Sequence, residues 1–366
     1  MNISYFCPPI YYEMRLSKKQ IARYSFLLFL IVLIGLVQGI PSWGTVYAYT
    51  IYPHIAYTLS SFSRVIPFSA GDLFILISIL WLTIFPIYSK YKKFKWKKIL
   101  FRMTEYLLWI YVWFYTAWGL NYSQPDFYQR TQIPYAAYTP ENFRFFLDDY
   151  IENLNASYAS TEELDKTTIH REVVEQYIRM EPALSINKPR KFPRVKNMMF
   201  PSVFTSMGIS GYMGPFFCEF NVNSQNPDSQ YASTYAHELA HYLGISSEAE
   251  ANFYAYVACT RSGDDITRFT GYFSILSHVL NNAYYLLTED EYRLVIKQIR
   301  PEIIDLSKVN RTFWVSNYNR TFGAIQDWIY NLYLKSNRIQ SGTKNYSEVI
   351  GLLISWQTHN RTLKPE

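Results

Sequence analysis

The stretch from Tyr24 to Ser63 contains no Asp, Glu, Lys or Arg. Residues 24–40 within it are strongly apolar and, with their flanks, are about long enough to cross a bilayer. Residues 46–63 are instead rich in Tyr, Ser and Thr and include Pro53. We expect this second part to be an amphipathic segment at the membrane interface. A chain that begins in this way is expected to be a membrane protein.

Two further apolar runs, residues 73–88 and 103–120, lie on either side of a lysine-rich loop that ends at Arg102. Cytoplasmic loops carry an excess of Lys and Arg. Three spans place this loop and the N-terminus in the cytoplasm and everything after the third span outside. A fourth span at residues 46–63 would put the lysine loop outside, against this rule. The alternative is that the loop is only a solvated basic linker.

The chain therefore divides into an N-terminal membrane domain, residues 1–120, and a second domain, residues 121–366. The second domain has ordinary polarity and no further run long enough to span. Its patterns predict helices over most of its length and one short strand, so the expected fold class is mainly α with a small sheet. The first residues contain no apolar segment followed by a small-residue cleavage site, so a cleaved signal peptide is not expected.

The motif H-E-x-x-H occurs at His237, Glu238 and His241. Residues four apart lie on one face of a helix, so both imidazoles can reach one metal ion. Glu238 lies beside them, where it can hold and deprotonate a metal-bound water. This is the physical content of the zinc-peptidase motif, and we expect Zn²⁺ as the cofactor.

The residues after the motif predict a sharp helix–turn–helix. Gly244 can adopt a left-handed conformation and end the motif helix. Ser247 can cap a second helix, with Glu250 reaching back in a capping box. That arrangement leaves Glu248 as the freer carboxylate and the favoured third metal ligand, with Glu250 as the alternative. Asn252 lies one turn further along and can steady Glu248.

Residues 216–223 alternate in the manner of a short strand, with Glu219, Asn221 and Asn223 on one face. In zinc peptidases an edge strand before the metal helix commonly holds the substrate in extended form. These three residues are candidates for that substrate strand. An ordinary sheet edge is equally consistent with the pattern.

Peptide hydrolysis also needs a hydrogen-bond donor for the oxyanion. The chain has 34 Tyr, so the sequence cannot rank the candidates. The donors considered are Tyr212, Tyr272, Arg338 and Tyr346. Cys218 and Cys259 are expected to be buried free thiols, although a disulfide is possible in principle. His170 lies on a polar stretch and is expected to be exposed.

Several runs resemble a bacterial family of membrane proteins of unknown function. They are Pro201-Ser202-Val203-Phe204, Gly211-Tyr212-x-Gly214-Pro215-Phe216, Glu219-x-Asn221-Val222-Asn223, His237-Glu238-Leu239-Ala240-His241 and Glu248-x-Glu250-Ala251-Asn252-Phe253. The resemblance extends from the first span to near the C-terminus. It implies three spans, a zincin-like α+β metallopeptidase domain and a bacterial cytoplasmic membrane.

The element Glu248-x-x-Ala251-Asn252 is similar to the E-x-x-A-[DN] element of gluzincins, which include the CAAX-prenyl-protease-like group. There the first Glu binds zinc, which implies the same role for Glu248. The sequence departs from that family in one respect. Only six residues separate His241 from Glu248, fewer than in most gluzincins. The sequence also differs from metzincins, another group of zinc peptidases, because Ser247 stands where they have a third His.

The leading hypothesis is a membrane-anchored zinc metallopeptidase that cleaves peptide bonds outside the cytoplasm by means of a zinc-activated water. Its partners would be a peptide or protein substrate, membrane-proximal in the favoured case, and the lipid bilayer. No motif supports nucleic-acid binding. The alternative is a non-catalytic membrane protein that uses a zincin-like fold for binding or assembly. Glu238 argues against it, because a structural site gains nothing from a carboxylate that binds no metal.

Overall fold

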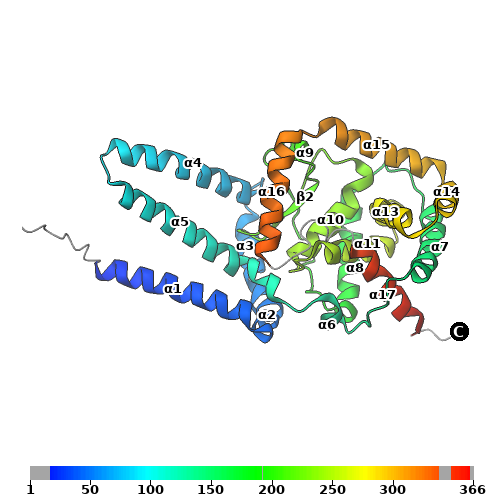
Figure 1. Ribbon diagram of the computed structural model, residues 1–366, viewed down its shortest axis with the longest axis horizontal. Helices are drawn as coiled ribbons and strands as arrows, with labels where there is room; N and C mark the ends of the chain where they lie inside the picture. The colour runs from blue at the N-terminus through cyan, green and yellow to red at the C-terminus, as the bar shows by residue number, and fades with distance from the viewer. Residues whose placement is uncertain (1–16, 192, 338–347, 363–366) are drawn as a thin grey trace, which may run out of the picture.

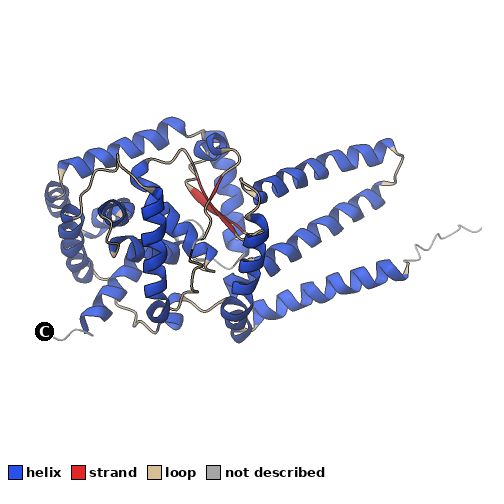
Figure 2. Ribbon diagram, turned by 180° about the vertical axis from the view of Figure 1, so that it is seen from behind, coloured by secondary structure: helices blue, strands red, loops and turns tan. Residues whose placement is uncertain are grey.

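The computed structural model describes residues 17–191, 193–337 and 348–362. Within these ranges the chain is mainly helical with one small sheet (Figure 2), which confirms the predicted fold class at that level. The elements in the first part are α1 (Lys18–Gly39), α2 (Pro41–Val46), a π-helical turn (Tyr47–Ile51), α3 (Tyr52–Ser63), α4 (Ala70–Tyr91), α5 (Trp96–Ala117) and a 3₁₀ turn (Gly119–Ser123).

The second part carries the sheet and the remaining helices. Its elements are α6 (Phe127–Thr131), α7 (Pro140–Ala156), α8 (Lys166–Leu184), β1 (Lys196–Asn197), α9 (Pro201–Ser206), β2 (Gly211–Gly214), β3 (Glu219–Val222), α10 (Asp228–Tyr242), α11 (Glu248–Thr260), α12 (Asp265–Ser274), α13 (Leu276–Leu286), α14 (Glu289–Gln298), α15 (Pro301–Asn317), α16 (Arg320–Ser336) and α17 (Val349–Thr362).

Helices α1, α4 and α5 extend side by side from one end of the globular part (Figure 1). Within the described ranges, α1 and α4 are the two helices that are long and apolar enough to cross a membrane. Only 17% and 22% of the residues in their most apolar windows are buried. A core helix of a soluble protein would be mostly buried, so this exposure favours contact with lipid.

The third expected span, residues 103–120, differs from the prediction. Its helix α5 begins earlier, at Trp96, and its first turns carry several charged side chains. It therefore does not reach the hydropathy of α1 and α4. One of its charges is neutralised by a neighbour, since Arg23 Nε on α1 lies 2.8 Å from Glu105 Oε1 on α5.

The segment predicted to lie at the interface, residues 46–63, forms the π-helical turn and α3. Helix α3 is too short to be a candidate span, and it runs across the direction of the three long helices (Figure 1). Its first residue, Tyr52, is 1% exposed, and its Oη donates to the carbonyl oxygen of Tyr242 at 2.7 Å. This contact joins the N-terminal part of the chain to the helix that carries the motif.

The sheet has the strand order β1-β3-β2. Strand β1 pairs with β3 in parallel, and β2 pairs with β3 antiparallel, in a register from Gly211 opposite Val222 to Gly214 opposite Glu219. The prediction that residues 216–223 form an edge strand is therefore wrong. The strand is shorter than expected, and it is the central one because both of its sides are paired. The edge strand near the motif helix is β2.

The core of the globular part is built around α10 and α11. Small residues, among them Ala236, Ala240, Ala251 and Ala255, let these helices pack closely against each other and against α8 and α12. Buried hydrophobic residues from α1 through α17 form one continuous cluster. The motif helix is consequently held by α8, α11, α12 and the sheet, which gives the rigidity that a metal site requires.

Candidate metal centre

The motif helix α10 ends at a tight turn, as the sequence predicted. Gly244 has φ of +99°, a conformation that residues with a side chain rarely adopt. A Cβ at this position would also lie 3.2 Å from Asn121 Oδ1 and from Tyr52 Cε1. Ser247 Oγ then accepts a hydrogen bond from the backbone N–H of Glu250 and begins α11. The turn directs the start of α11 back towards the two motif histidines.

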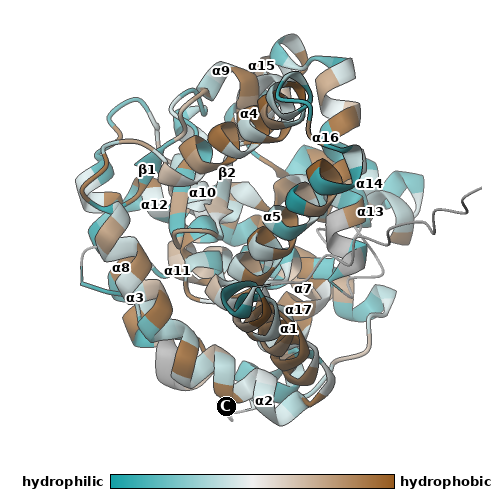
Figure 3. Ribbon diagram, turned by 90° about the vertical axis from the view of Figure 1, so that its left-hand side faces the viewer, coloured by the Kyte–Doolittle hydropathy of each residue, from teal (hydrophilic) through white to brown (hydrophobic). Residues whose placement is uncertain are grey.

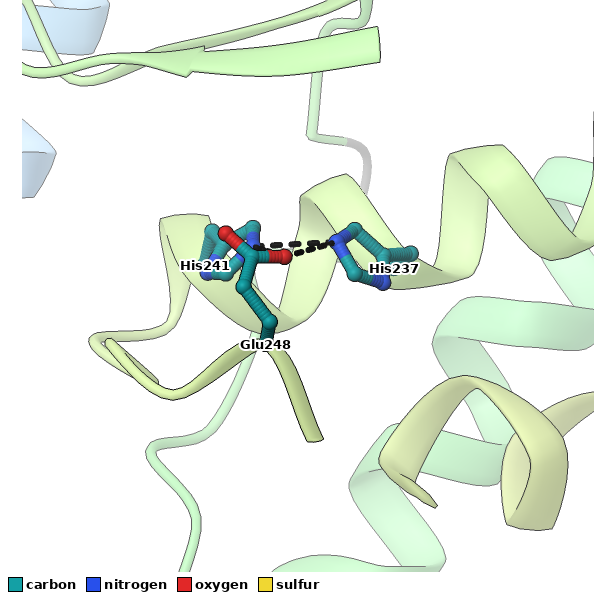
Figure 4. A group of neighbouring side chains, drawn as sticks. All are labelled: His237, His241 and Glu248. Atoms are coloured by element: carbon teal, nitrogen blue, oxygen red, sulfur yellow. Dashed lines mark hydrogen bonds and ion pairs between the residues drawn. The ribbon is translucent and has the colours of Figure 1, made fainter. Parts of the chain in front are cut away.

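Three side chains converge between the two helices (Figure 4). The Nε2 atoms of His237 and His241 lie 3.0 Å apart. Glu248 Oε2 lies 3.1 Å from the first of these atoms and 3.4 Å from the second. His241 and Glu248 are buried and His237 is half-buried. Two imidazoles and one carboxylate that converge on one point form a donor set that suits zinc.

The second nitrogen of each imidazole shows which tautomer is present. His241 Nδ1 lies 2.7 Å from the carbonyl oxygen of Ile245, which can only accept, so Nδ1 carries the proton. His237 Nδ1 lies 2.8 Å from Asn252 Oδ1 and donates to it in the same way. Both Nε2 lone pairs therefore face Glu248. Such an arrangement is repulsive unless a proton or a metal cation lies between the three donors.

The charges in the site lead to the same conclusion. Burial alone would raise the pKa of Glu248, but the two histidines hold it well below the usual value for a glutamate. Burial alone would lower the pKa of His241, but the charge of Glu248 outweighs it and raises that pKa to about 9. Glu248 thus stays ionised and requires positive charge beside it. A divalent cation meets this requirement and satisfies all three donors at once.

Glu238 is buried next to this cluster and points into a cavity. Its Oε2 has no hydrogen-bond partner among the described residues. Burial raises the pKa of this carboxyl group to about 7. A buried carboxylate oxygen without a partner is costly, so it commonly marks a position where a ligand or water binds.

A cavity of about 850 Å³ lies over the cluster. Its walls come from β2 with the residues before it, from α10 and α11, and from α15 and α16. Aromatic side chains make up much of the lining, including Trp118, Tyr212, Trp314, Tyr318 and Tyr330. The volume and the mixture of apolar walls with a few polar groups are those of a small-molecule or peptide site.

Two contacts of the site could not be predicted from the sequence. Tyr330, on α16, donates its hydroxyl hydrogen bond to Glu248 Oε1. Nothing distinguishes this residue from the other tyrosines, and it lies far from the motif along the chain. Trp118 Nε1 donates to the carbonyl oxygen of His241 at 3.0 Å and supports the end of the motif helix. Both contacts join segments that are distant in sequence.

The candidate substrate strand must be corrected. Glu219, Asn221 and Asn223 are at most 3% exposed and are bonded inside the protein. Glu219 forms an ion pair with Lys196 at 2.5 Å and accepts from the backbone N–H of Gly71 at 3.1 Å. The side-chain nitrogens of Asn221 and Asn223 donate to other chain segments. These residues stabilise the sheet and are not available to a substrate.

The alternative ligand Glu250 lies elsewhere. Its carboxylate forms an ion pair with Arg130, whose side chain is 2% exposed. Asn252 was expected to steady Glu248, but it contacts His237 instead. The structure therefore brings His237, His241 and Glu248 together and holds Glu250 by another partner.

The candidates for the oxyanion donor differ in their positions relative to the cavity. Tyr212 lines the cavity, but its hydroxyl donates to Asp72 at the start of α4. Tyr272 is not among the described residues that line the cavity. Arg338 and Tyr346 lie outside the described residues. The expectation of two buried free thiols is confirmed for Cys218 and Cys259.

Comparison with known proteins gives one result. No curated protein and no solved structure matches the chain. One family model, described as a protein of unknown function (DUF3810), matches residues 47–354. This match includes the cavity, the motif helix, α4 and α5, and it begins after α1, so it does not reach the first span as the resemblance implied. The chain therefore belongs to the DUF3810 family.

Proposed function

We propose that this protein is a membrane-anchored zinc metallopeptidase with a zincin-like domain. The observation that carries the proposal is the convergence of two imidazole lone pairs and the Glu248 carboxylate beside the unpartnered oxygen of Glu238. A structural zinc site is usually closed by four protein ligands. Here three donors face a large cavity, which leaves room for a water and a substrate.

His237, His241 and Glu248 would hold the zinc ion. When bound, zinc polarises a substrate carbonyl and lowers the pKa of a water to about 7. Asn252 and the Ile245 carbonyl orient the two imidazoles, so the donors need little rearrangement to bind. Tyr330 plays the same part for the second oxygen of Glu248.

Glu238 has the position and the pKa of a general base. Glu238 lines the cavity next to the three donors and has one oxygen without a partner among the described residues, so it can accept a proton from the attacking water. A carboxyl group whose pKa is raised by burial can hold this proton and then pass it to the amine that leaves. Both transfers use one carboxylate, so the peptide bond is hydrolysed with no further acid or base from the chain.

Strand β2 takes over the substrate role that was assigned to β3. It is an edge strand whose Gly211, Tyr212 and Met213 line the cavity beside Glu238. Within the described ranges β2 pairs only with β3, so its other side can accept an extended peptide by strand addition. This geometry favours a peptide over a compact small molecule as the substrate.

We further propose three spans, with α5 as the third. Figure 1 supports this topology, because the basic turn between α4 and α5 and the basic start of α1 lie at the same end of the three helices. The globular part lies at the opposite end. Because cytoplasmic loops carry an excess of Lys and Arg, the end with the basic segments is cytoplasmic. The candidate metal centre is then outside the cytoplasm of a bacterial cell.

The test begins with metal content. Full-length protein purified in detergent should contain about one zinc ion per chain, and His237→Ala/His241→Ala should contain none. Glu238→Gln should keep the metal and lose all turnover in a peptide-substrate screen. Protein that neither contains zinc nor takes it up on dialysis would contradict the proposal. Zinc with no difference between Glu238→Gln and wild type would favour the non-catalytic binding or assembly role.

A further inference from the structure

Helix α16 is amphipathic, but its apolar side is exposed and its polar side lines the cavity. Positions on one side of the helix carry large apolar residues, which are Phe322, Ile325, Trp328, Ile329 and Leu332. Their spacing of three, four and seven residues places them on one stripe. All five are between 47% and 68% exposed. In a soluble helix this stripe would face the core.

The opposite side of α16 faces the candidate metal centre. Gln326, Asp327 and Tyr330 line the cavity, and Tyr330 donates to Glu248. Among the residues of α16 whose burial is described, Gly323 alone is buried. The helix is therefore a thin wall, with the cavity on one side and an uncovered apolar stripe on the other. Large exposed apolar patches mark surfaces that meet another molecule or a membrane.

The position of α16 indicates what covers this stripe. Helices α16 and α3 stand at the edge of the globular part from which α1, α4 and α5 extend, and both run across their direction (Figure 1). In a view along the three long helices, α16 and α3 lie on either side of the ends by which these helices join the globular part (Figure 3). A bilayer crossed by these helices would have its surface at this edge.

The surface at α3, on the other side of the long helices, has the composition of a membrane interface. Helix α3 and the residue pair that follows it expose Tyr57, Phe62 and Val65, of which Val65 is 86% exposed. Arg64 and Arg194 are exposed beside them and suit lipid phosphates. Trp and Tyr are enriched at this depth of a membrane because one end of each ring system is polar.

We propose that the outer stripe of α16 lies in the boundary between the headgroups and acyl chains of the bilayer, so that one wall of the candidate metal centre rests on the membrane. This inference depends on the proposed membrane anchoring. It names the bilayer as the occupant, because α16 stands at the edge of the globular part from which α1, α4 and α5 extend (Figure 1). It also implies that substrates enter next to the lipid, as segments of membrane-attached chains.

The test measures lipid contact at single positions. The fluorophore bimane is attached at Trp328→Cys in the full-length Cys7→Ser background, in vesicles that contain nitroxide-labelled phospholipid. Cys218 and Cys259 are buried, so they do not react with the label in folded protein. Ile325→Cys repeats the measurement at a second position. Tyr285→Cys, on α13 at the far side of the globular part, is an exposed control.

Bimane at Trp328 and Ile325 should lose fluorescence to nitroxides near the headgroups and be shielded from aqueous iodide. Bimane at Tyr285 should show the reverse. Quenching at Trp328 and Ile325 by iodide alone would show that the stripe is in water, and quenching by neither agent would show that protein covers it. Either result overturns the inference.

A fourth variant separates this inference from the membrane anchoring itself. Phe29→Cys, on the exposed side of α1, should be quenched by nitroxides deep in the acyl region. Quenching at Phe29 without quenching at Trp328 and Ile325 would overturn only the placement of α16. Absence of quenching at all three positions would overturn the anchoring and, with it, the inference.

Discussion

Gly211 on β2 lies directly against Glu238 on α10. A Cβ at Gly211 would lie 2.6 Å from Glu238 Oε1 and 2.7 Å from its Cγ, closer than real Cβ atoms come. The side chain of Thr234 closes the same space at 2.8 Å. Only glycine allows the edge strand to pass this closely over the residue proposed as the general base.

Gly211→Ala should therefore displace Glu238 and leave the metal donors in place. We expect hydrolysis of the peptide found by screening to fall by about 10²-fold, because a displacement near 1 Å is enough for such a loss. Zinc content should equal that of wild type. Gly214→Ala, on the same strand, is the matched control, since its Cβ would meet no atom closer than 3.4 Å. Full activity in Gly211→Ala would contradict the assignment of Glu238.

Glu248 and Glu250 should respond differently to substitution. Glu248→Ala removes a donor from the cluster and should abolish zinc binding. Glu250→Ala leaves the buried Arg130 without its partner, which costs about 3–5 kcal/mol of folding free energy. It should lower the thermal unfolding midpoint and leave zinc content unchanged in the folded fraction. The double variant Arg130→Met/Glu250→Leu should recover most of that stability. Folded Glu250→Ala without zinc would identify Glu250 as a ligand.

Asn252→Ala should weaken zinc binding without abolishing it. The substitution removes the acceptor that fixes the tautomer of His237. Loss of such a partner typically lowers metal affinity by about 10–100-fold. Competition with a chromophoric chelator measures this change directly. Asn252→Asp keeps an acceptor and should retain tight binding, so equal weakening in both variants would count against this role.

The sequence was sufficient for features that depend on local chemistry. Gly244 and Ser247 predicted the helix–turn–helix because a positive φ and a helix cap are determined by single residues. The apolar runs of α1 and α4 were found because length and composition alone identify a candidate span. For Cys218 and Cys259 the sequence favours free thiols but leaves a disulfide open, and the structure has both as free thiols.

Features that depend on long-range pairing were missed or misplaced. The alternating pattern of residues 216–223 predicts a strand but not its neighbours, and the strand expected at the edge of the sheet is the central one. Helical spacing predicts the face on which Asn252 lies but not its partner, which is His237 and not Glu248. Tyr330 reaches the site only because α16 folds back over the cavity.

His170 shows the same limitation and leads to a prediction about pH. Its polar surroundings in sequence indicated exposure, but its ring stacks on Tyr235 with centroids 4.2 Å apart. Its Nε2 also lies 2.8 Å from the hydroxyl of Tyr231. Burial, with a smaller effect from Lys166, lowers the pKa of His170 from 6.5 to about 4.

The unfolded chain therefore binds a proton at His170 near pH 6.5, whereas the folded protein binds it only near pH 4. The stability from this residue should be complete above pH 6.5 and should decrease by up to about 3 kcal/mol as the pH falls to 4. His170→Gln should flatten the decline of the thermal unfolding midpoint between pH 7 and about 4.5. His54→Gln, a substitution at an exposed position, is the matched control. If His170→Gln and wild type lose stability in parallel, His170 already binds its proton in the folded state, and the stacked geometry is not what controls its titration.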